Sequence, residues 1–180
     1  MSVNRLLFDN QLIIKCAFSM AASNIVFKAR LILYDKGKIL LLKQTKPQGG
    51  NYTLVGGNIE NGEYAKQCLI RESFEEAGIL LKEKDLHLVH VLQKNTDKEI
   101  RLVLYFKAYL WEGKARSREP QKFKEVNWFE LDELPRNLTG TVRHVLDQYR
   151  HGHMYSEFKK KKSANKKPML PGEGPEGSAV

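Results

Sequence analysis

One acidic segment in the first half of the chain constrains its structure most. Its residue spacing predicts a helix over residues 63–77, and Gly78 follows where a C-cap glycine belongs. Within that helix Glu72, Glu75 and Glu76 lie at positions i, i+3 and i+4. At about 100° per residue, the three carboxylates share an arc of about 100° on one helix face.

Like charges this close repel one another by a few tenths of a kcal/mol per pair, unless a positive charge lies among them. Hard oxygen ligands suit Mg²⁺ or Mn²⁺, which can bridge carboxylates and substrate phosphates. The alternative is a solvated acidic face. Apolar residues flank the glutamates on both sides, Ile70 and Phe74 on one and Cys68 and Leu69 on the other. We therefore expect a helix packed on two sides that holds a metal.

Strand-like segments surround this helix. Residues 26–34 alternate, with Lys28 and Arg30 on one face and Ala29, Leu31 and Leu33 on the other. An Asp-Lys-Gly turn leads to a returning strand over residues 38–43, which predicts a hairpin. Further strands are expected at 52–55, 87–94, 100–111 and 125–130, and a second helix at 138–149. Strands mixed with two helices predict an α/β domain.

Length and composition set the outer limits. The 180 residues, 42% hydrophobic and 28% charged, suit one globular domain, and no apolar run approaches the ~20 residues of a membrane span. We expect a leader over 1–24, a domain over 25–158, and a disordered lysine-rich tail over 159–180. Polar residues interrupt the leader, which makes it a poor signal peptide. Two distant cysteines, Cys16 and Cys68, indicate a reducing cytoplasm.

The central segment follows a longer pattern. From Gly57 it reads glycine, five residues, Glu63, seven residues, and then Arg71-Glu72-Ser73-Phe74-Glu75-Glu76-Ala77-Gly78-Ile79. This resembles the Nudix box, with its fixed residues and final aliphatic position matched. At ordinary amino-acid usage, such a match arises by chance at roughly 10⁻⁹ per starting point. Ser73 is the one departure, since the family has an aliphatic residue there, and it concerns local packing.

The flanks also resemble the family, so that the likeness spans residues 26–149. The segment 51–57 is similar to the usual entry to the box, with Val55 in place of a proline. Downstream, Glu119-Pro120 and Trp128-Phe129 resemble the later half of MutT-like members.

The resemblance implies an α/β/α sandwich around a mixed sheet. It also implies a hydrolase that cuts nucleoside diphosphate-linked compounds with Mg²⁺ or Mn²⁺. Glu72, Glu75, Glu76 and the backbone carbonyl of Gly57 are then the metal ligands. The catalytic set is Glu72, Glu75 and Arg71. Arg71 and Glu63 orient the carboxylates, while Glu72, Glu75 and the loop carboxylate Glu119 compete as general base.

The substrate follows by elimination. Markers of ADP-ribose, dinucleoside polyphosphate, coenzyme A and NADH hydrolases do not occur at their usual places, which favours a nucleoside triphosphate, including oxidised ones. ADP-ribose, a nucleotide sugar and capped RNA stay open, as does a non-catalytic nucleotide-binding module. Lys46 and Lys122 are candidate phosphate contacts, and Tyr52, Trp111 and Trp128 are either base-stacking or core residues.

Charge and the terminal segments bear on partners. The net charge is +9, of which six lysines and two glutamates after Phe158 contribute +4. We expect no membrane partner. The lysine tail offers a route to nucleic acid through phosphate contacts, and the leader offers a route to a homodimer.

Overall fold

The computed structural model of this chain describes residues 24–96 and 99–159. The predicted leader before Asn24, with Cys16, and the predicted tail after Lys159 lie outside the described residues. So do Asp97 and Lys98, which lie between the predicted strands 87–94 and 100–111. Among the described residues, no helix has the length and apolar character needed to cross a bilayer.

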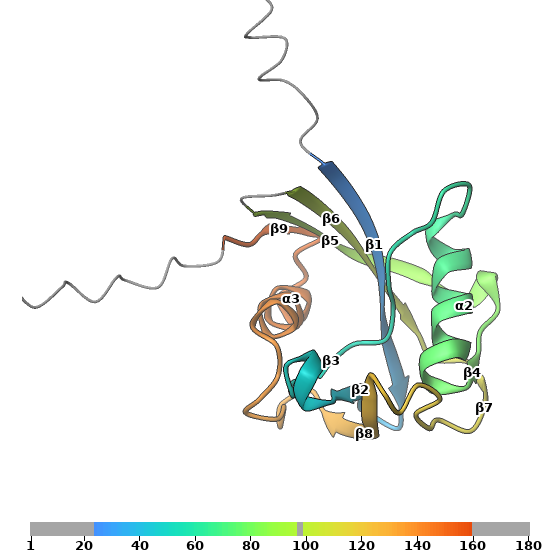
Figure 1. Ribbon diagram of the computed structural model, residues 1–180. Helices are drawn as coiled ribbons and strands as arrows, with labels where there is room; N and C mark the ends of the chain where they lie inside the picture. The colour runs from blue at the N-terminus through green and yellow to red at the C-terminus, as the bar shows by residue number, and fades with distance from the viewer. Residues whose placement is uncertain (1–23, 97–98, 160–180) are drawn as a thin grey trace, which may run out of the picture.

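The long first strand organises the sheet. Strand β1 (Asn24–Asp35) runs parallel to β6 (Glu99–Ala108), in register from the pair Asn24 and Glu99 to the pair Leu33 and Ala108. Strand β5 (His87–Asn95) pairs antiparallel with β6, and β9 (Tyr155–Glu157) pairs parallel with β5. The central sheet is therefore mixed, as predicted (Figure 1).

A second group of strands bends away from β1. The predicted hairpin is present: β2 (Lys38–Gln44) returns antiparallel to β1 through a turn in which Lys36 and Gly37 have φ of 49° and 82°. Beyond the turn, β2 pairs with β8 (Phe123–Glu130) and β3 (Tyr52–Thr53). Among the described residues these strands complete a seven-stranded sheet.

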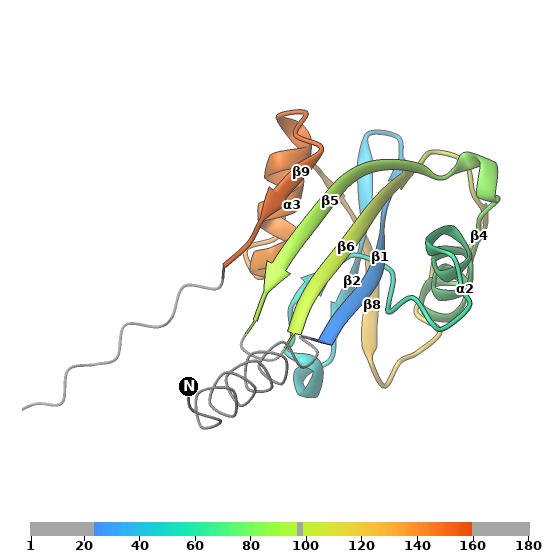
Figure 2. The ribbon, with the colours of Figure 1, turned by 90° about the horizontal axis from the view of Figure 1, so that it is seen from above.

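Two helices cover opposite faces of the sheet. Helix α2 (Ala65–Ala77) packs on one face, and α3 (Gly140–Arg150) packs on the other, as Figures 1 and 2 show. The alternation within β1 creates both contacts: Leu31 joins the core beside α2, and Ile32 joins the core beside α3. The predicted α/β/α sandwich is confirmed.

Two expectations about the acidic helix are wrong. It begins at Ala65 rather than residue 63, because Glu63 closes a turn with its N–H 3.0 Å from the Glu60 carbonyl. It also packs on one side only, since Phe74 is 42% exposed beneath the Arg118 guanidinium, 4.0 Å from the ring centre. The buried residues of the helix share one face: Cys68, Leu69, Ser73, Glu76 and Ala77.

Short elements close the end of α2. The predicted strand 100–111 stops at Ala108, and β7 (Glu112–Gly113) pairs instead with β4 (Ile79–Leu80) in a separate two-stranded sheet. Two single-turn 3-10 helices, Lys46–Gln48 and Glu83–Asp85, complete the elements of the described part. Pairing of β4 with β7 places the segment after β7 beside the last turn of α2, where Arg118 N–H donates to the Glu76 carbonyl at 3.1 Å.

A buried histidine attaches the last described strand to the sheet. His90 of β5 is fully buried, and its Nδ1–H donates to the His153 carbonyl at 2.7 Å. The Ser156 hydroxyl of β9 donates to its Nε2 at 2.8 Å, while Ser156 Oγ accepts from His144 Nε2–H at 3.1 Å. With the Ser156 hydroxyl in this orientation, His90 is neutral. Burial lowers the pKa of His90, helped by the charges of His144 and His153 and opposed by the bond to the His153 carbonyl.

The protein should lose thermal stability as the pH falls below 6.5, the ordinary pKa of histidine. The unfolded chain takes up a proton at His90 that the folded chain resists, so this contribution is complete above that pH and declines below it. We expect His90→Gln to flatten the change in Tm between about pH 7.5 and pH 5.5. His87→Gln, at an exposed position on the same strand, is the control. An unchanged pH dependence in His90→Gln contradicts the assignment.

Candidate active site

Arg71 is the centre of an ion-pair cluster on α2. Its Nε and Nη2 donate to the two oxygens of Glu63, at 2.9 and 3.0 Å. Its Nη1 donates to Glu72 Oε1 at 3.0 Å and to Glu75 Oε2 at 3.2 Å. Paired charge-assisted bonds of this kind fix orientation as well as adding energy. The guanidinium also holds the pKa of Glu63 below its usual range, mainly through the direct hydrogen bonds.

The two glycines before α2 permit close approaches that other residues block. A Cβ at Gly57 would lie 2.0 Å from Glu72 Oε1, so the Glu72 carboxylate rests against the Gly57 backbone. Gly56 has φ of 126°, and a Cβ there would lie 2.2 Å from the Ala29 carbonyl oxygen on β1. Glycine is therefore required at both positions, at one to seat a carboxylate and at the other to pack against a strand.

The loop that carries these glycines is bonded to β1. Main-chain bonds run from Ala29 N–H to the Gly57 carbonyl at 3.1 Å and from Leu31 N–H to the Val55 carbonyl at 3.0 Å. Arg30 Nη1 donates to the Leu54 carbonyl at 3.0 Å and also to the Gly56 carbonyl. This role of Arg30 was not predicted from the sequence. One available signal was its position on the same strand face as Ile32, which is buried.

Glu76 differs from the other box glutamates because it is buried. It is 5% exposed, and its Oε2 accepts a hydrogen bond from the Gly56 N–H at 2.9 Å. Burial raises the pKa of Glu76 to about 8, and the charges of Glu72 and Glu119 add to the rise. The Gly56 hydrogen bond and the Arg30 charge act in the opposite direction. The side chains of Glu72 and Glu75 are 16% and 50% exposed.

The other predicted residues occupy varied positions. Glu119 lies near enough to Glu76 to influence its pKa, but its Oε1 is paired with Lys122 Nζ at 2.7 Å. Lys46 is exposed at the start of the 3-10 helix Lys46–Gln48. The three aromatic candidates pack on neighbouring aromatic rings: Trp111 and Trp128 stack with centroids 5.8 Å apart, and Tyr52 meets Phe129 edge-on.

The donor set fits a hard divalent cation. Carboxylates and a backbone carbonyl are the ligand types that Mg²⁺ and Mn²⁺ take. The Gly57 carbonyl already accepts one bond from Ala29 and keeps a second lone pair. Within residues 24–96 and 99–159, no three histidine, cysteine, aspartate or glutamate side chains are already arranged to hold a metal ion. Arg71 instead forms hydrogen bonds with Glu72 and Glu75. A cation beside Glu76 would offset the cost of its buried charge.

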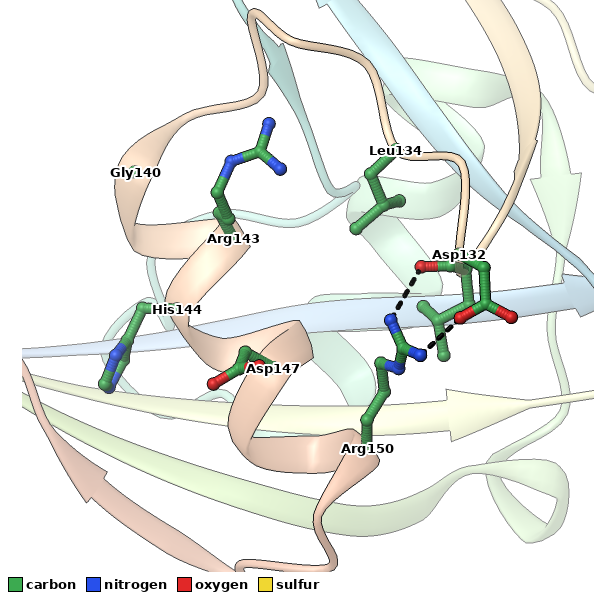
Figure 3. Close-up of a pocket in the computed structure, with 8 residues that line it drawn as sticks. Asp132, Leu134, Gly140, Arg143, His144, Asp147 and Arg150 are labelled. Carbon is green, nitrogen blue, oxygen red and sulfur yellow. Dashed lines mark hydrogen bonds and ion pairs between the residues drawn. The ribbon is translucent and has the colours of Figure 1, made fainter.

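A separate cavity of about 550 Å³ lies along α3, on the opposite side of the sheet from α2 (Figure 3). Its cations are already engaged, because Arg150 pairs with Asp132 and Arg143 Nη2 donates to the Pro135 carbonyl at 2.7 Å. No predicted site residue lines it, so it does not belong to the carboxylate cluster.

Comparison with known proteins agrees with this geometry. The family model of the NUDIX domain matches residues 27–149, which is more than half of the 180-residue chain. The chain therefore belongs to the Nudix hydrolase family. Its fold is similar to that of a MutT NUDIX hydrolase from Burkholderia pseudomallei, with a TM-score of 0.63 and 29% identity, over 69% of this chain and 98% of the other.

Curated relatives include proteins named NAD-capped RNA hydrolase NudC. The one from Pseudomonas aeruginosa is 28% identical over 79% of this chain and 47% of its own length. The one from Escherichia coli O157:H7 is 33% identical over 54% of this chain and 36% of its own length. The chain thus aligns with less than half of either relative.

Replacing Gly57 by alanine should remove activity while leaving the fold intact. The new Cβ would displace the Glu72 carboxylate, which is the movable end of a flexible side chain. A misplacement of about 1 Å near the reacting groups costs about 100-fold in rate. We expect at least that loss in kcat, with Tm changed by no more than a few degrees. Gly140→Ala, where a Cβ meets nothing within 4 Å, is the matched control.

Ser73→Ala should stabilise the protein. The Ser73 hydroxyl is fully buried and has no hydrogen-bond partner among the described residues, which costs free energy in the folded state. We expect about 1 kcal/mol of added stability, seen as roughly 2–4 °C in Tm. The control is Ser156→Ala, which removes the hydroxyl bonded to His90 and should lower Tm. A lower Tm for Ser73→Ala would show that the hydroxyl has a favourable interaction.

Proposed function

We propose that this chain is a divalent-metal-dependent pyrophosphohydrolase that cleaves the diphosphate linkage of a nucleotide substrate. The observation that carries the proposal is the cluster on α2, where Arg71 bonds both Glu72 and Glu75 while Glu72 rests against Gly57. A solvated acidic face does not need a glycine beneath one carboxylate or a buried, backbone-bonded Glu76.

In this proposal Glu72, Glu75, Glu76 and the Gly57 carbonyl hold Mg²⁺ or Mn²⁺. Bound there, the metal supplies charge neutralisation of phosphate oxygens and a more acidic water. Arg71 is a positioning residue, since it bonds two of the proposed ligands. Glu63 in turn holds Arg71 through two bonds to its guanidinium.

A carboxylate must also take a proton from the attacking water. Among the three candidates we favour Glu75, because half of its side chain is exposed and water can reach it. The Glu72 side chain is 16% exposed and lies against Gly57. Glu119 Oε1 is already engaged in an ion pair with Lys122 Nζ at 2.7 Å.

For the substrate, a nucleoside triphosphate, including oxidised forms, is the first candidate, with nucleoside monophosphate and pyrophosphate as products. The missing substrate markers and the likeness to the MutT protein support it. Capped RNA is the second candidate, supported by the names of the NudC relatives. Both substrates contain the diphosphate linkage that the proposed site would cut.

The test is a hydrolysis assay of the purified chain with Mg²⁺. Canonical and oxidised nucleoside triphosphates, ADP-ribose, NAD, a nucleotide sugar, a dinucleoside polyphosphate and capped RNA are supplied in turn, and products are separated by chromatography. We expect monophosphate release that requires the metal. Tight nucleotide binding without turnover of any substrate would favour a non-catalytic binding module instead.

Glu76→Gln should abolish this turnover and raise Tm. The amide keeps an oxygen for the Gly56 N–H but binds a cation poorly, and it removes an ionisable group from a buried position. We expect a loss of at least about 100-fold in kcat and a gain of about 1 kcal/mol or more in stability. Glu83→Gln, at an exposed position, is the control and should change neither. Full activity in Glu76→Gln would remove this residue from the metal site.

A further inference from the structure

A row of basic side chains crosses the central sheet on the face that carries α3. Arg101 of β6 is the direct partner of Lys94 on β5 and of Val26 on β1. Lys28, two residues beyond Val26, lies on the same face, because side chains alternate along a strand. Neighbouring strands are about 4.8 Å apart and residues about 3.3 Å apart along a strand, so the backbone positions from Lys28 to Lys94 extend over about 12 Å.

Lys28 stands at the end of the row nearest the carboxylate cluster. Its backbone bridges to Asn58, which follows Gly57, and the charge of Glu72 acts on it. Its side chain is half-buried, and among the described residues its ammonium makes no hydrogen bond or ion pair. Burial holds the pKa of Lys28 below its usual range, and the charges of Arg30 and Arg101 lower it further against the opposing effects of Glu99 and Glu72.

Contacts within the sheet and with α3 orient the other two members. Arg101 Nε bonds to Glu99 of the same strand. Lys94 Nζ donates to Thr141 Oγ1 on α3 at 3.0 Å and lies 5.2 Å from the centre of the Phe158 ring. By contrast, Arg30 is committed to the carbonyls of Leu54 and Gly56. The row therefore consists of Lys28, Arg101 and Lys94, leading away from Glu72.

Three basic side chains on one face of the sheet, of which Arg101 is paired with Glu99, favour a chain of anions rather than a single one. Lys28, beside the Gly57–Asn58 segment and within reach of the Glu72 charge, is the member of the row closest to the carboxylates.

We propose that Lys28, Arg101 and Lys94 bind the phosphates that lie beyond the scissile diphosphate. The preferred substrates of this chain then carry several phosphates on that side. This inference rests on the proposed function and specifies its substrate class. Two sources share the chemistry: the polyphosphate chain of a nucleotide, and the phosphodiester backbone of an RNA that continues from its 5′ end.

The experiment compares three probes on the full chain with Mg²⁺: a nucleoside triphosphate, a dinucleoside tetraphosphate, and a short RNA with a 5′-triphosphate. Turnover gives KM and kcat, and fluorescence anisotropy in the Glu76→Gln background gives Kd. For Lys28→Gln we expect Kd and KM to rise about tenfold for a multi-phosphate probe, because one charge-assisted bond is lost. We expect kcat to stay unchanged. For RNA, the slope of log affinity against log salt should fall by about 0.7.

Two variants control this measurement. Lys28→Arg keeps the charge and should restore the affinity, which separates the charge from packing of the side-chain stem. Lys38→Gln removes an exposed lysine at the start of β2, opposite Asp35 at the end of β1 and 4.0 Å from Glu130, and should leave every constant unchanged.

The outcomes are distinct. If Lys28→Gln and the unchanged chain bind all three probes with equal affinity, the proposed phosphate-binding role of the row is wrong. If Lys28→Gln weakens the binding of RNA alone, the row binds a phosphodiester backbone. If it weakens the binding of the tetraphosphate alone, the row binds a polyphosphate chain. If no probe is hydrolysed but Lys28→Gln still weakens binding, the proposed function fails while the row stands.

Discussion

Main-chain bonding between β1 and the loop before α2 is the constraint on which the site depends. Three bonds tie the loop to the strand, from Ala29 to Gly57, from Leu31 to Val55, and from Ile59 to Phe27. These bonds bring the glycine pair against the strand, and the Gly56 N–H in turn fixes Glu76. Because α2 follows the same loop, the positions of its carboxylates depend on β1, which is paired with β6 along ten residues.

Features governed by local chemistry were predictable from the sequence. The hairpin between β1 and β2, the alternation of β1 and the glycine at the end of α2 each depend on a few adjacent residues, and the structure has all three. The start of α2 was predicted wrongly because the turn at Glu63 competes with the helix. Strands β4, β7 and β9 are two or three residues long, and only their distant partners define them.

The candidate site also has features that the sequence predicts and features that only the tertiary structure defines. Helical spacing placed the three glutamates together, and the structure adds that Arg71 bonds two of them. The spacing among the three glutamates does not by itself separate buried Glu76 from half-exposed Glu75, although the position of Glu76 seven residues after the buried Leu69 was an available signal. The bonds from Arg30 to two carbonyls 24 and 26 residues away belong to the tertiary structure, and so does the row of cations across three strands.

The parallel pairing of β1 with β6 also affects how the chain acquires its structure. The two strands are partners across a separation of 75 residues, with Asn24 opposite Glu99, and the entire acidic helix lies in the intervening segment. Non-local parallel pairing is slow because a long loop must close before the contacts form. During synthesis from the N-terminus, α2 emerges before the strand that completes its platform. A nascent chain therefore carries its acidic helix without a finished sheet until β6 has been made.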